Sequence, residues 1–163
     1  MTEYVFFYGH NPNEPYGCFS NFFPSNFTVN GIIYNCSEQY FMKMKQEMFD
    51  PNNHNLANKI MSTTNPFVIK KFGRQVNNYD DIKWNQERYK IMVDALTAKF
   101  SQNANLKQIL VNTGNKHLAE TTKNDKIWAI GLDLNDPKRF DETQWKGQNL
   151  LGKALMDVRK NIS

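Results

Sequence analysis

Residues 82–101 carry the longest helical pattern of the chain, and this pattern limits the fold class more than any other feature. Side chains spaced three and four residues apart lie on one face of an α-helix, and an apolar face of this kind packs against other elements. The side chains that cluster toward one side of the segment are Trp84, Arg88, Ile91, Met92, Ala95, Leu96 and Lys99. The pattern therefore predicts a mainly helical protein.

Shorter segments with helical spacing precede and follow the long one. Pro66 suits a first helical position, where no amide hydrogen is required, and Gly73 is typical of a residue that ends a helix. We expect these helices over 38–48, 55–62, 66–72, 106–111 and 149–160. The chain has 163 residues, with no internal repeat or interdomain linker. The sequence therefore predicts a single domain over residues 1–163.

Strand signals are fewer and lie mostly near the N-terminus. Residues 4–8 are aromatic and β-branched, which favours a strand, and residues 117–120 form a second, brief candidate. Residues 27–29 and 32–34 flank Asn30-Gly31, a strong signal for a β-hairpin. The predicted fold class is therefore mainly α: a single helical domain with a small antiparallel β-sheet near the N-terminus.

The composition indicates a globular protein with a mild preference for anions. Apolar residues make up 40% of the chain and charged residues 22%, which excludes a disordered chain. Twenty basic and sixteen acidic residues leave a net charge of +4. This charge favours ligands such as phosphates, but it is too small and too evenly spread to indicate nucleic-acid binding by itself. The densest basic segment, residues 70–74, is more often an exposed helix end than a phosphate clamp.

Cysteine and histidine usage predicts neither disulfides nor a metal site. Cys18 and Cys36 are too few for a disulfide framework, so reduced thiols and a cytoplasmic location are expected. His10, His54 and His117 are isolated from one another and from the cysteines, so we expect no metal and no cofactor. No apolar run approaches the roughly 20 residues that span a membrane, and no signal-peptide pattern is present.

Residues 36–45 contain the first candidate for chemistry. Ser37 is a suitable N-cap for the following helix, and Glu38 would lie beside the positive end of the helix dipole. Lys45 follows almost two turns later on the same face, roughly 10 Å away along the axis. An acid and an amine at this separation can flank a sugar-sized ligand. The alternative is a solvated helix face that carries two charges.

Two further clusters combine aromatic and polar side chains. Asn21 and Phe22 offer an amide beside a ring face, although a hydrophobic turn capped by asparagine has the same pattern. Trp84 and Arg88 are one helical turn apart, so the indole can stack on a base while the guanidinium meets a phosphate. The alternative for this pair is a half-buried tryptophan covered by the arginine stem.

Two polar clusters occur later in the chain. Glu120 and Asp125 precede Trp128, which suits acid–base chemistry beside a stacking ring, whereas the alternative is an Asx turn around Asp125. Gly147 allows backbone to approach a ligand closely, and Asn149 precedes a helix whose N-terminus can bind an anion. The alternative for the last pair is a capping asparagine after a glycine turn.

The order and spacing of these motifs resemble the NADAR family, from about Phe6 to Arg159. The motifs are Ser37-Glu38-Gln39-Tyr40-Phe41 with Lys45, Lys99-Phe100, Glu120 with Asp125 and Trp128, and Gly147-x-Asn149-x-Leu151-Gly152 continuing to Leu155-Met156-x-x-Arg159. The family is named for a predicted association with NAD and ADP-ribose metabolism. The resemblance implies a mainly α-helical, YbiA-like fold and an N-glycosidase. YbiA-type enzymes act on early riboflavin-pathway intermediates, and other members remove ADP-ribose from guanine bases.

The resemblance implies roles for particular residues in hydrolysis of the N-glycosidic bond of a ribosylated base. Glu38 and Asp125 are the candidates for stabilising a ribosyl cation and for moving a proton, and their assignment stays open. Lys45 either neutralises a phosphate or holds Glu38 ionised. Alternatively, as a desolvated amine, it attacks the anomeric carbon and forms a Schiff base with the opened sugar. The expected partner is a phosphorylated ribosyl or ADP-ribosyl substrate, including one attached to nucleic acid. The predicted substrate-binding residues are Asn21, Phe22, Tyr40, Trp84, Arg88, Glu120, Trp128, Gly147 and Asn149.

Two positions depart from the family pattern. The family usually has histidine after the glutamate, where this chain has Gln39, which hydrogen-bonds but cannot carry a proton. The family usually has Trp-Gly in the later motif, where this chain has Trp128-Ala129. The change at Ala129 is mild unless that backbone requires a positive φ. The loss of histidine supports the alternative function, a non-catalytic module that binds ADP-ribose or a nucleotide.

Overall fold

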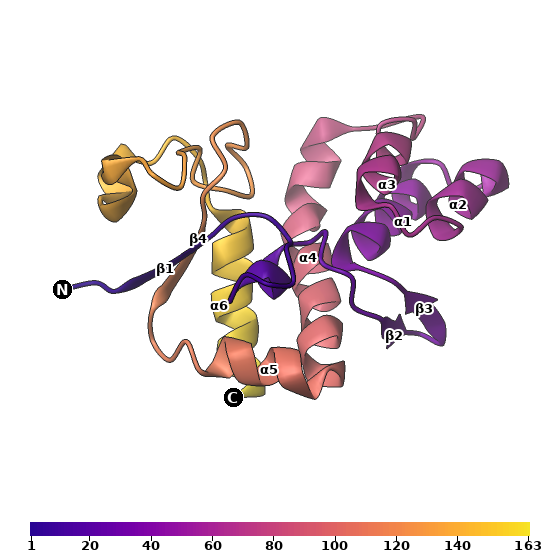
Figure 1. Cartoon of the computed structure of the whole chain (residues 1–163). Helices are drawn as coiled ribbons and strands as arrows, with labels where there is room; N and C mark the ends of the chain where they lie inside the picture. The colour runs from indigo at the N-terminus through magenta and orange to yellow at the C-terminus, as the bar shows by residue number, and fades with distance from the viewer. The chain divides into compact units, whose positions relative to one another are not determined.

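The computed structural model describes residues 1–163 and is mainly helical, as the sequence predicts (Figure 1). None of its helices combines the length and the apolar character that crossing a bilayer requires. It contains no cluster of three or more histidine, cysteine or acidic side chains able to hold a metal ion. The elements are β1 (Tyr4–Phe7), η1 (Gly17–Phe19), β2 (Phe27–Val29), β3 (Ile32–Tyr34), α1 (Ser37–Phe49), α2 (His54–Met61), α3 (Pro66–Gly73), α4 (Asp81–Gln102), α5 (Ala104–Val111), β4 (His117–Glu120), η2 (Pro137–Phe140), η3 (Glu142–Gln144) and α6 (Leu150–Ile162).

Capping side chains explain where several helices begin. The Asn53 side chain accepts a hydrogen bond from an amide of the first turn of α2, and Asn65 caps α3 directly before Pro66. The Asp80 carboxylate accepts hydrogen bonds from two amides of α4. These groups pair amides that have no partner inside the helix, so α2, α3 and α4 begin where a capping side chain is available.

The contacts divide the chain into two compact units. The first unit comprises residues 1–20 and 104–163, and the second comprises residues 21–103. Each unit has buried apolar side chains of its own. The interpretation of residues 1–163 as a single domain stays a prediction.

The second unit consists of α1 to α4 and the predicted hairpin. Strands β2 and β3 pair in antiparallel fashion, with Phe27 opposite Tyr34. Asn30 and Gly31 have φ values of 52° and 80° at the turn, as a tight hairpin loop requires. Phe27 and Tyr34 pack with Tyr40 of α1 and with α4 to form a buried cluster. The hairpin therefore closes one side of the pair formed by α1 and α4.

The first unit contains a strand pair that the sequence analysis did not anticipate. Strands β1 and β4 are parallel, with Tyr4 opposite His117 and Phe7 opposite Glu120. Helix α6 packs against β4 so closely that a Cβ atom on Gly152 would lie 2.1 Å from the Leu118 carbonyl oxygen. The predicted apolar stripe of this last helix is buried, which confirms the pattern. The buried members of the stripe are Leu151, Ala154, Leu155 and Val158.

Candidate active site

Glu38 lies in the first turn of α1, and its side chain is buried, with 7% of its surface exposed. Its amide donates a hydrogen bond to the carbonyl oxygen of Asn21 at 3.0 Å. The prediction that Ser37 caps this helix is wrong, because Cys36 occupies the cap position and Ser37 lies within the helix. The Ser37 hydroxyl instead donates to Asn21 Oδ1 at 3.0 Å. Both residues therefore attach the start of α1 to the preceding loop.

Lys45 lies further along α1 and is half-buried. Its Nζ donates to the carbonyl oxygen of Gly73 at 2.9 Å and lies 4.7 Å from the centroid of the Tyr79 ring. Burial lowers the pKa of the Lys45 amine; the charge of Glu38 raises it, and that of Arg74 lowers it. The acid and the amine of α1 therefore interact electrostatically, and a solvated helix face is excluded because Glu38 is buried.

Helix α3, whose Gly73 carbonyl accepts from Lys45, also carries a lysine beside aromatic rings. Lys70 Nζ lies 5.9 Å from the centroid of the Phe22 ring, and Phe22 meets Phe67 edge-on at 4.9 Å between centroids. Burial is the main cause that raises the pKa of the Tyr79 phenol to about 12, with a hydrogen bond to Asp81 adding to the effect. The predicted basic segment 70–74 contributes the Gly73 carbonyl and the charge of Arg74 to the surroundings of Lys45, whereas Lys70 is exposed.

The other predicted binding residues of the second unit are placed mainly for packing. Trp84 is buried against Phe41 and Phe49, with ring centroids 4.9 and 6.1 Å away. Tyr40 is buried in the cluster beneath the hairpin. Arg88 is half-buried, and its Nη1 donates to Asn85 Oδ1 at 2.7 Å. Burial of both rings agrees with core packing, so stacking of a base on Trp84 or Tyr40 stays a prediction.

The acidic residues of the first unit lie on β4 and in the loop that follows. Glu120 ends β4 and is half-buried. Asp125 Oδ1 accepts the amides of Ile127 at 3.0 Å and Trp128 at 2.9 Å, which is the Asx turn considered as the alternative. Asp125 therefore shapes the loop that carries Trp128, and its role as a second catalytic carboxylate stays a prediction.

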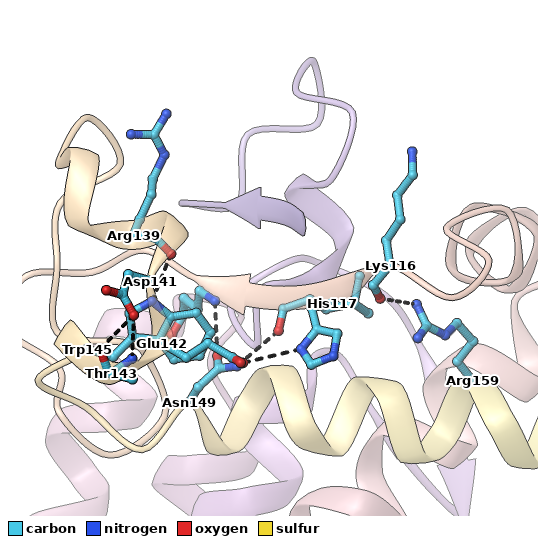
Figure 2. A network of polar contacts seen from close by, with 11 residues as sticks. Lys116, His117, Arg139, Asp141, Glu142, Thr143, Trp145, Asn149 and Arg159 are labelled. Atoms are coloured by element: carbon cyan, nitrogen blue, oxygen red, sulfur yellow. Dashed lines mark hydrogen bonds and ion pairs between the residues drawn. The ribbon is translucent and has the colours of Figure 1, made fainter. Parts of the chain in front are cut away.

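Gly147 and Asn149 organise the main chain of the first unit, and Figure 2 shows Asn149 within the polar network there. Asn149 is 2% exposed, has a left-handed backbone with φ of 54°, and makes no side-chain cap to α6. Its Oδ1 accepts the amide of Glu120 at 3.3 Å, and its Nδ2 donates to the Leu118 carbonyl at 3.0 Å. A Cβ atom on Gly147 would lie 2.2 Å from the carbonyl oxygen of Ala129. The close approach that this glycine permits is therefore to the chain's own loop.

The predicted site residues consequently fall into two sets. The structure brings Glu38, Lys45 and Asn21 together in the second unit, with Phe22, Tyr40, Trp84 and Arg88 in the same unit. In the first unit, Asp125 accepts a hydrogen bond from the amide of Trp128, and Asn149 accepts one from the amide of Glu120. Gly147 lies in the same unit. The sequence analysis assigned no role to Lys99, Arg74 or Tyr79. The signals for Lys99 were a lysine on the apolar side of a long helix and its place in the Lys99-Phe100 motif.

The two departures from the family pattern have structural explanations. The Gln39 side chain is buried; its Oε1 accepts the amide of Asn35 at 2.8 Å, and its Nε2 donates to the Ile60 carbonyl at 3.1 Å. Successive residues of a helix point about 100° apart, so Gln39 and Glu38 face different neighbours. Ala129 is buried without a positive φ, so alanine is compatible with its backbone. Gln39 therefore connects the start of α1 to the end of α2.

The candidate site combines a buried carboxylate and a partly desolvated amine on one helix of a small, mainly helical scaffold. The fold is similar to the NMR structure of the Escherichia coli protein YbiA, with a TM-score of 0.76 and 28% identity over 99% of this chain and 87% of that chain. The model of the NADAR domain matches residues 6–163, and the chain belongs to the NADAR family.

Curated relatives match over most of the chain. N-glycosidase R617 of Acanthamoeba polyphaga mimivirus is 39% identical, covering 97% of this chain and 95% of the relative. N-glycosidase YbiA of Escherichia coli is 30% identical over 94% of this chain and 86% of the relative. A riboflavin biosynthesis protein of Vibrio vulnificus is 28% identical over 99% of this chain, which spans 39% of that longer protein. The relatives named N-glycosidase support a hydrolase that acts on N-glycosyl bonds.

Proposed function

We propose that this protein is an N-glycosidase that hydrolyses the bond between ribose and a base in a substrate that carries phosphate or ADP-ribose. The observation that carries the proposal is the buried carboxylate of Glu38 on the same helix as the partly desolvated amine of Lys45. Relatives named N-glycosidase, which match this chain over most of their length, support the reaction type. The relative named as a riboflavin biosynthesis protein supports a ribosylaminopyrimidine phosphate as one candidate substrate.

The chemistry assigns a task to the Glu38 carboxylate. When the bond between the anomeric carbon and the base nitrogen breaks, both electrons leave with the base and positive charge develops on the ribose. A carboxylate beside the anomeric carbon stabilises that charge. Water then forms the new bond to the anomeric carbon and releases a proton, and the departing base gains one. Asp125 is the proposed acid–base partner, as a second carboxylate of the motif.

Lys45 is proposed to hold the phosphate of the substrate. Arg74 acts on the Lys45 amine, and Lys70 lies on the neighbouring helix, so positive charge gathers on this side of the second unit. A lowered pKa also increases the fraction of neutral amine, which a nucleophile requires. Treatment with borohydride during turnover separates the two roles. A covalent adduct at Lys45 would establish the nucleophile, whereas turnover without trapping supports phosphate binding.

The decisive experiment offers two substrates to the purified protein. One is DNA that carries ADP-ribosylated guanosine, and the other is a ribosylaminopyrimidine phosphate of riboflavin biosynthesis. Mass spectrometry would detect free ADP-ribose or ribose phosphate, with Glu38→Gln as the matched control. Release by the wild type that disappears in Glu38→Gln supports the proposal and selects the substrate. Binding of both ligands without release would instead favour the non-catalytic module.

A further inference from the structure

Lys99 is a fully buried lysine within the apolar face of α4. Its side chain has 0% of its surface exposed, and its Nζ lies 5.1 Å from the centroid of the Phe100 ring and 5.9 Å from that of Phe23. Ring faces attract a cation, but they do not replace the water that an ammonium group loses on burial. A buried charge is retained when an opposite charge accompanies it. A buried anion close to its amine would therefore stabilise a charged Lys99.

The packing of α1 against α4 places Lys99 beside the first turn of α1. Trp84, near the start of α4, contacts Phe49 at the end of α1. Ala95, further along α4, shares a buried cluster with Tyr40, which lies earlier on α1. The ring of Trp84 also lies 4.9 Å from that of Phe41, next to Tyr40, so α4 passes the first half of α1 between Trp84 and Ala95, and Lys99 follows one turn beyond Ala95. The cation lies where the partial positive charge of the α1 dipole also lies, which increases the need for an anion.

Glu38 is the anion that the structure provides. Among the buried side chains of the whole protein, Glu38 is the only acid and Lys99 the only base. Both charges act on the buried thiol of Cys36. Its pKa rises to about 11, mainly through burial, while the charge of Glu38 raises it and the charge of Lys99 lowers it. One thiol therefore lies within the electrostatic reach of both groups.

We propose that Lys99 is a positioning residue that forms a buried ion pair with Glu38 and holds the Glu38 carboxylate ionised and in a fixed orientation. The ion pair is inferred from the packing of the second unit alone. Its effect on catalysis rests on the proposed N-glycosidase function. An ionised Glu38 stabilises the ribosyl cation and does not serve as the proton donor to the base. Proton transfer is then left to another group, for which Asp125 is the candidate.

The groups around Glu38 predict how its ionisation changes when Lys99 is replaced. Lys99 approaches from α4, Lys45 from the same helix, and Cys36 from the preceding turn. Beyond Lys45 lie Arg74 and Tyr79, and Tyr34 of β3 lies in the cluster that α1 covers. An opposite charge within hydrogen-bond range lowers a carboxyl pKa by about one to three pH units. Removing Lys99 should therefore raise the pKa of Glu38 by about that amount.

The first test needs no turnover. The carboxyl carbon of Glu38, assigned by its absence in Glu38→Gln, is titrated by NMR in the wild type, in Lys99→Met and in Lys90→Met. Lys90 lies on α4 but is exposed and pairs with Asp94, so its replacement controls for general charge. A rise in the Glu38 pKa of about one to three pH units in Lys99→Met alone supports the ion pair. An unchanged titration in Lys99→Met would overturn it.

Loss of folding in Lys99→Met does not prevent the test, because the double variant Glu38→Gln with Lys99→Met removes both charges. Recovery of cooperative unfolding in the double variant supports the pair, since an uncompensated buried carboxylate is then the cause of the loss. If the double variant also fails to fold while Glu38→Gln folds, Lys99 acts through packing and the ion pair is refuted.

Activity supplies the second test. In Lys99→Met the acid limb of the kcat profile should move to higher pH with KM nearly unchanged, while Lys99→Arg should restore the wild-type limb. Below the raised pKa of Glu38, the ionised fraction of the carboxylate falls about tenfold for each further drop of one pH unit. An acid limb that stays in place in Lys99→Met would refute the positioning role. Absence of turnover in the wild type, with the NMR shift still present, would refute the proposed function and leave the ion pair intact.

Discussion

Polar residues that looked equivalent as sequence motifs serve different purposes in the two units of the molecule. In the second unit, Glu38 is buried, and its charge acts on the half-buried amine of Lys45 further along α1. In the first unit, Asp125 and Asn149 direct their hydrogen bonds to main-chain groups of β4 and the following loop. Polar side chains bonded to main-chain groups in this way stabilise a loop, and Lys45 makes one such bond itself, to the Gly73 carbonyl. The units therefore differ in that one holds a buried acid near a half-buried amine, whereas the other holds polar contacts that shape a loop.

Glu38→Gln is the change with the largest expected effect on activity. The amide keeps the shape of the side chain but loses the charge that stabilises the ribosyl cation, so kcat should fall by roughly 10³-fold. Steady-state kinetics measures this loss, and circular dichroism checks the fold. Glu47→Gln is the matched control, because Glu47 is exposed on the same helix and pairs with Lys43. Equal activity of the two variants would remove Glu38 from the mechanism.

Asn149→Ala should produce the largest loss of stability in the first unit. The change leaves the Glu120 amide and the Leu118 carbonyl without their partner and places alanine at a positive φ. A buried polar group without a partner costs about 1–3 kcal/mol, so the free energy of unfolding should fall by roughly that amount. Denaturant titration measures the change. Unaltered stability with lost substrate binding would instead make Asn149 a ligand residue.

Asp125→Asn tests whether Asp125 only shapes its loop or also takes part in the reaction. Asparagine retains an oxygen that can accept the amides of Ile127 and Trp128 but removes the charge. Thermal stability should therefore stay close to that of the wild type, while Asp125→Ala should lose about 1 kcal/mol. A fall in kcat for Asp125→Asn at unchanged stability would support the second catalytic carboxylate. Full activity of this variant would limit Asp125 to shaping the loop.

Gln39→His has the smallest expected effect on turnover. The Gln39 amide bonds main-chain groups before α1 and at the end of α2, so imidazole should lower the melting temperature without increasing kcat. Thermal denaturation and steady-state kinetics on the same preparation measure both quantities. A large gain in kcat would show that the residue at position 39 takes part in proton transfer. Glutamine in place of histidine would then be the cause of a lower turnover.

Local features of the sequence predicted most elements of the fold. Helical spacing, Pro66 and the Asn30-Gly31 turn act between neighbouring residues, and the structure contains the helices and the hairpin that they predicted. The prediction for Ser37 failed because its hydroxyl has a partner in a loop sixteen residues earlier. Propensity alone does not reveal such a partner. A capping residue and a residue that binds a remote loop have the same local pattern.

The sequence by itself determined the family motifs, the amphipathic helices and the presence of Glu38 and Lys45 on one helix face. Only the tertiary structure decided that β1 pairs in parallel with β4, that Glu38 and Lys99 are buried, and that Asn149 bonds to β4. Periodicity arises from contacts within a few residues, so it can be read along the chain. Strand partners and the burial of a charge depend on segments that are distant in the sequence, and these meet only when the chain packs.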